Sequence, residues 1–111
     1  MTKWPAIIKY RGESELTYID SGSEWDCDAD LHFFRYDSAD QLIDSEGNIF
    51  SLVDMTDNFV KPRAINCSVS KETMQDLIRA HFSSIGECCV SKFSIGSIAE
   101  GITTVGQFEE S

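Results

Sequence analysis

The segment from Ser70 to Gly86 constrains the fold more than any other part of the chain, because its pattern fits a helix with one buried face. Ser70 is placed to cap the first amides, and Gly86 is placed to end the helix in the left-handed conformation. The apolar residues recur at helical spacing: Met74, Leu77, Ile78, Phe82 and Ile85. The segment therefore predicts an amphipathic helix that lies on a hydrophobic layer made by other parts of the chain.

The residues before this helix have the composition of β-strands. Ala6–Tyr10 and Leu16–Ile19 predict an N-terminal hairpin, with turn residues between them. Leu31–Tyr36, Gln41–Asp44 and Asn48–Val53 predict a three-stranded meander, and a glycine is available for the second of its turns. The first half of the chain therefore predicts a mostly antiparallel sheet.

Two segments in this half are expected to be less regular. Ser21–Asp30 predicts a loop with one helical turn, capped by Ser23 and anchored to the core by Trp25. Asp54–Arg63 predicts an irregular connection in which Phe59 and Val60 are partly buried.

The second half predicts a β-α-β-α unit. Ala64–Val69 leads into the central helix as a strand, and Cys88–Ile95 follows it as a second strand, which implies a right-handed crossover between parallel strands. Ser97 and Glu100 form a capping box for a short final helix with Ile98, Ile102 and Val105 on its apolar stripe. Gly101 weakens that helix by about 1 kcal/mol relative to alanine. The predicted fold is a single α+β domain over residues 1–111, with helices packed on one face of the sheet.

Composition and length fit a soluble, folded domain. A chain of 111 residues with 41% hydrophobic residues can bury one core without metal or disulfide staples. The N-terminus lacks the apolar run of a signal peptide, and no segment reaches the length of a membrane span. We expect a cytoplasmic protein with no membrane contact and with its four cysteines reduced.

The net charge of −10 is unevenly distributed. Thirteen acidic residues and one basic residue, Arg35, lie between Glu13 and Asp57. Such a charge repels phosphate, so nucleic-acid binding is not expected. It attracts basic proteins, although a solubilising surface is the simpler explanation, because solubility needs only a net charge away from zero. The candidates for an interaction surface are acidic residues of this stretch: Asp37, Asp40, Asp44, Glu46, Asp54 and Asp57.

Part of the sequence resembles the start of a calcium-binding loop, but the complete motif is not present. Asp26, Asp28 and Asp30 have the spacing that begins an EF-hand loop, and they are the weak metal candidates of the chain. The match then breaks, because Leu31 stands where glycine is required and Asp37 stands where a bidentate glutamate is required. No metal or other cofactor is therefore expected.

The cysteines and histidines have ordinary structural explanations. Cys88 and Cys89 are neighbours on a predicted strand, so their thiols point to opposite faces and are interpreted as buried and inert. His81 lies at the edge of the helical stripe, where a backbone carbonyl can satisfy it, and His32 can bind Asp30 on the same strand face. None of the common phosphate-binding, nucleophile-elbow or zinc-protease motifs is present.

The chain resembles a family of small uncharacterised bacterial proteins of about this length that carry a domain of unknown function. The resemblance spans nearly the whole chain, and it implies a compact bacterial cytosolic domain with no activity to carry over. It rests on patches that carry no chemical motif: Trp4–Lys9, Asp30–His32, Leu42–Ser45 with Gly47, and Cys88–Lys92.

The sequence leaves the function unknown and favours a non-enzymatic acidic module that binds a basic protein partner. One alternative is an enzyme or small-ligand binder with a pocket near Asp30, His32 and Cys88 or Cys89. Another is a DNA mimic that inhibits a basic protein, which needs the carboxylates along one ridge. Whether the chain is a monomer or a homodimer stays open, because exposed strand edges can pair.

Overall fold

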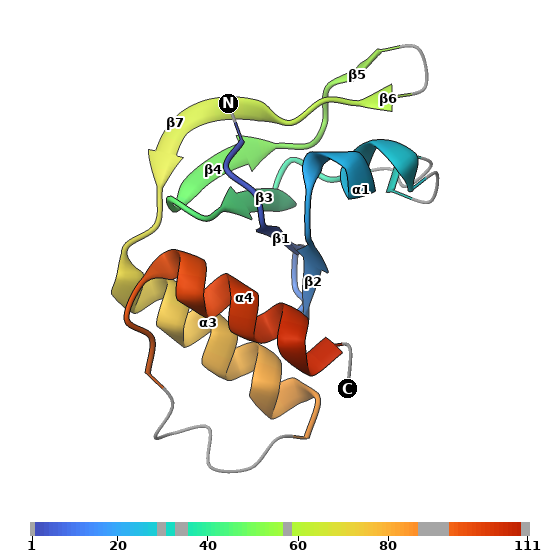
Figure 1. The fold of residues 1–111 in the computed structure, drawn as a ribbon. Helices are drawn as coiled ribbons and strands as arrows, with labels where there is room; N and C mark the ends of the chain where they lie inside the picture. Colours follow the sequence, from blue (N-terminus) through green and yellow to red (C-terminus); the bar gives the residue numbers. More distant parts are fainter. Residues whose placement is uncertain (1, 29–30, 33–35, 57–58, 87–93, 110–111) are drawn as a thin grey trace.

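A five-stranded antiparallel sheet forms the centre of the computed structural model, which describes residues 2–28, 31–32, 36–56, 59–86 and 94–109 (Figure 1). The strand order is β2–β1–β3–β4–β7, with β1 (Ala6–Lys9), β2 (Leu16–Ile19), β3 (Gln41–Asp44), β4 (Asn48–Ser51) and β7 (Arg63–Ser68). Outside it lie α1 (Gly22–Cys27), β5 (Met55–Thr56), β6 (Phe59–Val60), α3 (Lys71–Ser84) and α4 (Ile98–Glu109). The α+β fold class is confirmed.

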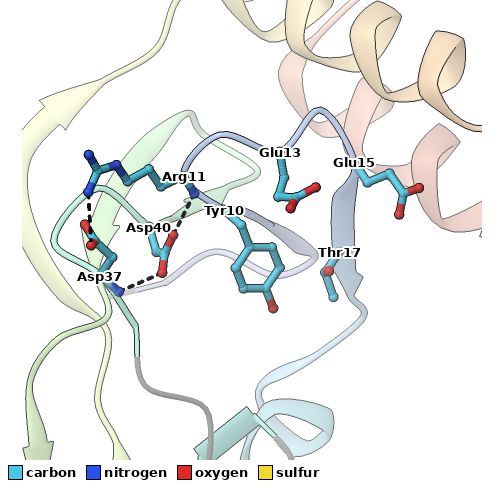
Figure 2. Close-up of a pocket in the computed structure, with 7 residues that line it drawn as sticks. All are labelled: Tyr10, Arg11, Glu13, Glu15, Thr17, Asp37 and Asp40. Carbon is cyan, nitrogen blue, oxygen red and sulfur yellow. Dashed lines mark hydrogen bonds and ion pairs between the residues drawn. The ribbon is translucent and has the colours of Figure 1, made fainter.

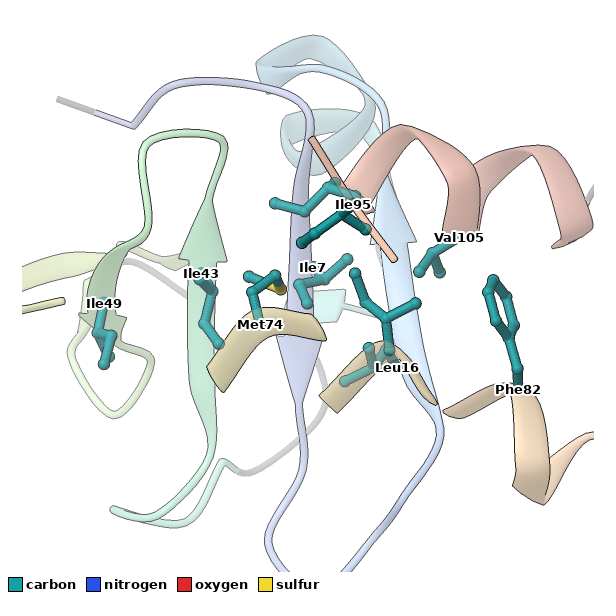
Figure 3. Packing of buried hydrophobic residues seen from close by; sticks show 10 residues of the cluster. Ile7, Leu16, Ile43, Ile49, Met74, Phe82, Ile95 and Val105 are labelled. Atoms are coloured by element: carbon teal, nitrogen blue, oxygen red, sulfur yellow. The ribbon is translucent and has the colours of Figure 1, made fainter. Parts of the chain in front are cut away.

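The central strands β1 and β3 are buried on both faces of the sheet. Ile7 and Ile43 face one core, which α3 and α4 cover with residues such as Met74 and Val105 (Figure 3). The neighbouring strand residues Ala6, Ile8 and Leu42 face a second core on the other side of the sheet. This core is covered by Trp25 of α1 and by Leu52 and Val60, which follow β4. Both faces of the sheet therefore carry a hydrophobic layer.

The central helix has the predicted cap and the predicted buried face. The Ser70 hydroxyl accepts a hydrogen bond from the Thr73 amide at 3.1 Å, and Gly86 has φ 86°. Met74, Ile78 and Phe82 are buried in the first core, whereas Ile85 is 42% exposed. The expectation for Ile85 is wrong because the helix ends at Ser84, and Ile85 instead caps it by donating its amide to the His81 carbonyl.

Both predicted hairpins are present, in the registers Ile7↔Tyr18 and Ile43↔Ile49. Gly47 adopts φ 84° in the second turn, as its position between the strands predicts. The turn at residues 21–30 is helical as expected, but its cap is Ser21, whose hydroxyl accepts from the Glu24 amide, and not Ser23. Trp25 is buried, which confirms its role as an anchor.

Two strand expectations are corrected by the structure. Leu31 and His32 are helical, so the strand predicted over Leu31–Tyr36 is wrong for these described residues. Their side chains are buried near Trp25, and aromatic composition alone does not distinguish such helical residues from those of a strand. The connection Asp54–Arg63, which was expected to be irregular, contains the β5–β6 pair. The sequence did not predict these strands, because a strand of two residues is too short to show an alternating pattern.

The strand that leads into the central helix is confirmed as β7, which pairs antiparallel with β4. Most of the predicted strand Cys88–Ile95 lies outside the described residues, and Ser94 and Ile95 are not in a strand. Within the described part of the chain every strand pair is antiparallel, so the expected parallel crossover is not seen there.

His81 links α3 to β2 inside the core. Its side chain is 3% exposed, and Nδ1 accepts a hydrogen bond from the Leu16 amide at 2.8 Å. The partner is thus a backbone amide and not the expected carbonyl, and Nε2 is buried without a partner. Burial lowers the pKa of His81, and the nearby Glu15 carboxylate opposes that shift. The folded protein therefore favours the neutral ring.

Gly101 is a point of close approach between α4 and α3. A Cβ at this position would lie 2.6 Å from Ile78 Cδ1 and 3.1 Å from Ile95 Cδ1. Ile78 is fully buried, so it has little room to move. The glycine that weakens the isolated helix is what lets α4 pack against α3.

We expect Gly101→Ala to lower the free energy of unfolding by about 1–3 kcal/mol through overpacking. Helix propensity alone predicts the opposite sign, a gain of about 1 kcal/mol. Urea denaturation measures the difference. Thr103→Ala, an exposed position on α4, is the control and should stay within about 0.5 kcal/mol of the native chain. A stabilised Gly101→Ala protein would show that the helices are not closely packed here.

The stability that neutral His81 provides should be complete above the unfolded-state pKa of about 6.5 and should decline as the pH falls below it. The sign follows from the lowered pKa, because the unfolded chain takes up the proton first. His81→Gln is the reference, since an amide oxygen can still accept from Leu16 and does not titrate. Urea unfolding between about pH 7.5 and 5 should show the native chain losing stability relative to this variant. A difference independent of pH would contradict the burial of the ring.

Candidate functional site

The clearest hollow among the described residues is a pocket of about 540 Å³ between the β1–β2 turn and the turn before β3 (Figure 2). This size is typical of ligand pockets. Seven side chains line it: Tyr10, Arg11, Glu13, Glu15, Thr17, Asp37 and Asp40. Segments distant in sequence thus meet here because β1 lies between β2 and β3 in the sheet.

Asp40 holds the two turns together. Its side chain is only 4% exposed, and its two oxygens accept hydrogen bonds from the Arg11 and Asp37 amides, both at 2.7 Å. Two charge-assisted bonds from the backbone fix the positions of both turns. Asp40 therefore shapes the wall of the pocket, and its oxygens are already occupied.

Asp37 and Arg11 form an exposed ion pair at the mouth, with Asp37 Oδ2 3.3 Å from Arg11 Nη1. The pKa of Asp37 is lowered, first by the hydrogen bond from the Ala39 amide and then by the Arg11 guanidinium. The carboxylate is therefore ionised at neutral pH, and the turn and the cation together keep it in place.

Tyr10 forms the aromatic part of the wall. Its ring stacks on that of Tyr36, with the two planes nearly parallel and the centroids 6.2 Å apart. Burial raises the pKa of both tyrosines above the usual value for a phenol. Both phenols are thus neutral at pH 7, and neither can serve as a base.

The pocket has an excess of negative charge. Among the described residues that line it, four side chains are carboxylates and one, Arg11, is cationic. Glu13 and Glu15 are exposed, and they form no ion pair with the described residues. Glu15 precedes Leu16, whose amide is held by His81, so its backbone is anchored to α3. The site can therefore attract a cation and place it against an aromatic ring.

The carboxylates surround the cavity and do not converge on one point. Within the described ranges no group of three or more histidine, cysteine, aspartate or glutamate side chains is arranged to hold a metal ion. Asp26 and Asp28 are exposed at the end of α1, and Asp30 lies outside the described residues. The geometry of the pocket thus suits an organic cation better than a metal.

The other candidates for the interaction surface are spread over the molecule. Asp44 is corrected: it is fully buried, and its carboxylate accepts from the Lys3, Glu46 and Asn48 amides at 2.9–3.1 Å. A carboxylate enclosed by backbone donors is a structural element and not part of a surface. Glu46 is exposed in the β3–β4 turn.

Asp54 lies 2.6 Å from Arg63 in an exposed ion pair, and Asp57 lies outside the described residues. Of the five candidates that the structure describes, Asp37 and Asp40 are the two that it brings together at one site.

His32 has a structural role and does not line the acidic pocket. Its Nε2 lies 2.9 Å from the Trp25 carbonyl, and its Nδ1 accepts from the Val60 amide at 3.0 Å. Both ring nitrogens are therefore used to join α1 to β6, and the ring also stacks on Phe59. Asp30, Cys88 and Cys89, the other members of the proposed pocket, lie outside the described residues.

The sequence interpretation missed Tyr10, Arg11 and Thr17 as pocket residues, and it counted Glu13 and Glu15 in the acidic stretch without naming them as site candidates. A signal was available at the first turn, where Arg11 and two glutamates follow a strand that ends in tyrosine. It could not show that the turn at Asp37–Asp40 lies opposite, because that depends on the order of strands in the sheet.

In the described part of the chain, no helix is both long enough and apolar enough to cross a membrane.

The comparisons with known proteins agree with this fold and name no activity. A structure titled as the NMR structure of the protein from Shewanella amazonensis is similar to this chain, with a TM-score of 0.69 and 28% sequence identity. The match covers 96% of this chain and 90% of the other.

A search of curated proteins found no match. The family DUF4144, described as a protein structure with unknown function, matches residues 4–105. Because this match covers nearly the whole chain, the protein belongs to the DUF4144 family.

Proposed function

We propose that this protein is a non-enzymatic interaction module of the bacterial cytoplasm that binds a cationic segment of a partner protein in its acidic pocket. The observation that carries the proposal is the pocket beside the first hairpin, with four carboxylates, one guanidinium and a tyrosine ring around about 540 Å³. A lysine or arginine side chain fits a cavity of this kind, with its charge near Glu13 and Glu15 and its stem against Tyr10.

The charge of the whole chain supports the same partner. A net charge of −10 steers positively charged surfaces toward the protein and repels nucleic acids. The segment Glu13–Asp57 has thirteen acidic residues against one basic residue, and it supplies all four carboxylates among the described residues of the pocket. Long-range attraction and the local site therefore favour the same class of ligand.

Binding is favoured over catalysis by the residues that line the pocket. None of the described lining residues is a histidine, cysteine, serine or lysine, and Tyr10 is neutral at pH 7. Two of the carboxylates that could act as a nucleophile or base are engaged elsewhere, Asp40 with the Arg11 and Asp37 amides and Asp37 with the Arg11 guanidinium. A DNA mimic is less well supported, because Asp44 is buried and Asp54 is paired with Arg63.

A capped peptide with lysines at alternate positions, separated by serines, tests the proposal by calorimetry. We expect Glu13→Gln combined with Glu15→Gln to weaken binding about tenfold, since each partly exposed ion pair contributes about 0.7 kcal/mol. Raising the salt from about 50 to 300 mM should also weaken binding, because it screens exposed charges.

The matched control is Glu72→Gln, an exposed glutamate in the first turn of α3 that is outside the pocket. It should retain the native affinity for the lysine peptide. The pocket variant loses two charges and Glu72→Gln loses one. If the loss of binding free energy per removed charge is the same in both, the peptide is held by the net charge of the protein and the pocket proposal is wrong. Equal binding of a glutamine-substituted peptide would also refute it.

A further inference from the structure

β7 leaves one edge of the central sheet open. All six of its residues are exposed, β4 lies on one side, and no described strand pairs with the other side. At the other end of the sheet, α4 contacts β2, and the Tyr18 ring lies against Gly106 of this helix. An open edge presents backbone donors and acceptors to an added strand.

The backbone of Ser68 points toward this open side. Val69 donates its amide to the Gly47 carbonyl at 2.9 Å, which places the Val69 amide on the β4 side. Successive residues of a strand direct their backbone groups to opposite sides, and Ser68 is the neighbour of Val69. The Ser68 amide and carbonyl are therefore directed away from β4 and are available to a new strand.

A hollow of about 350 Å³ lies beside this edge. It is lined by residues of β4 and β7: Asn48, Ile49, Phe50, Ala64, Asn66, Cys67 and Ser68. The ladder between the two strands shifts register between Ile49 and Phe50, and Asn66 has φ 57° at this bulge. The bulge thus opens a hollow next to a free edge, where a side chain of an added strand can insert.

The edge has the opposite charge from the rest of the chain. The sequence from Phe59 to Lys71 contains no acidic residue, and its Lys61 and Lys71 are exposed; its third cation, Arg63, is paired with Asp54 at 2.6 Å. Three of the nine cationic residues therefore lie in this segment of a chain with net charge −10. A strand that docks here is stabilised by acidic side chains.

We propose that the β7 edge binds an extended acidic segment of a partner protein as a sixth strand, with one of its side chains in the hollow beside Asn66. This site is independent of the acidic pocket, and it takes a ligand of opposite charge. A second copy of the chain is a poorer ligand, because pairing of β7 with itself brings like charges together and joins two molecules of net charge −10.

The probe is a capped peptide in which glutamate alternates with valine, added to isotope-labelled protein. We expect amide exchange at Ser68 to slow about tenfold or more at saturation, because the amide gains a hydrogen-bond partner. Ser68→Pro removes this donor at an edge position where proline is tolerated, and it should abolish peptide binding. Ser68→Ala keeps the donor and should bind as the native chain does.

Lys61→Glu is a second variant that leaves the sheet intact, and it should weaken binding of the acidic peptide several-fold. A peptide with glutamine in place of glutamate should bind more weakly than the acidic one. Equal binding of the two peptides, or an unprotected Ser68 amide at saturation, would overturn the proposal. Protection of Ser68 without peptide, together with a mass that rises with concentration, would assign the edge to a second copy and would also overturn it.

Discussion

Burial of β1 and β3 on both faces is the constraint on which the rest of the structure depends. Each of Ile7, Ile8, Leu42 and Ile43 is almost fully buried, and such a side chain contributes about 1.5–3 kcal/mol. When a strand is apolar on both faces, the alternation of polar and apolar side chains does not determine its register with its neighbours. Asp44 fixes the register at the end of β3, because its buried carboxylate accepts hydrogen bonds from the backbone amides of Lys3, Glu46 and Asn48.

The two candidate binding surfaces follow from where this sheet ends. The helices α3 and α4 cover one face of the sheet, and α1 and the segment after β4 cover the other. The turns at one end and the β7 edge are surfaces that the sheet still offers to other molecules. Asp40 organises the turns into an acidic pocket by binding the Arg11 and Asp37 amides. The bulge near Asn66 opens a hollow at the cationic edge. The two surfaces have opposite charge and therefore fit different ligands.

Local patterns in the sequence predicted the α+β class, the central helix and both hairpins, because these depend on periodicity, caps and glycine turns. They failed for Leu31 and His32, whose helical conformation depends on contacts with Trp25 and Phe59. They also failed for Asp44, since a count of charges does not reveal which carboxylate is enclosed by amides. The acidic pocket needed the strand order, which brings residues 10–17 opposite residues 37–40.

The central claim is that the pocket beside the first hairpin is the place where a cation binds. Chemical-shift mapping of isotope-labelled protein with a lysine-containing peptide tests it most directly. The account predicts saturable shifts at the amides of residues 10–17 and 37–40, with the β7 edge unchanged. Shifts spread evenly over exposed acids such as Glu24, Glu46 and Glu72, or shifts confined to another part of the surface, would contradict it.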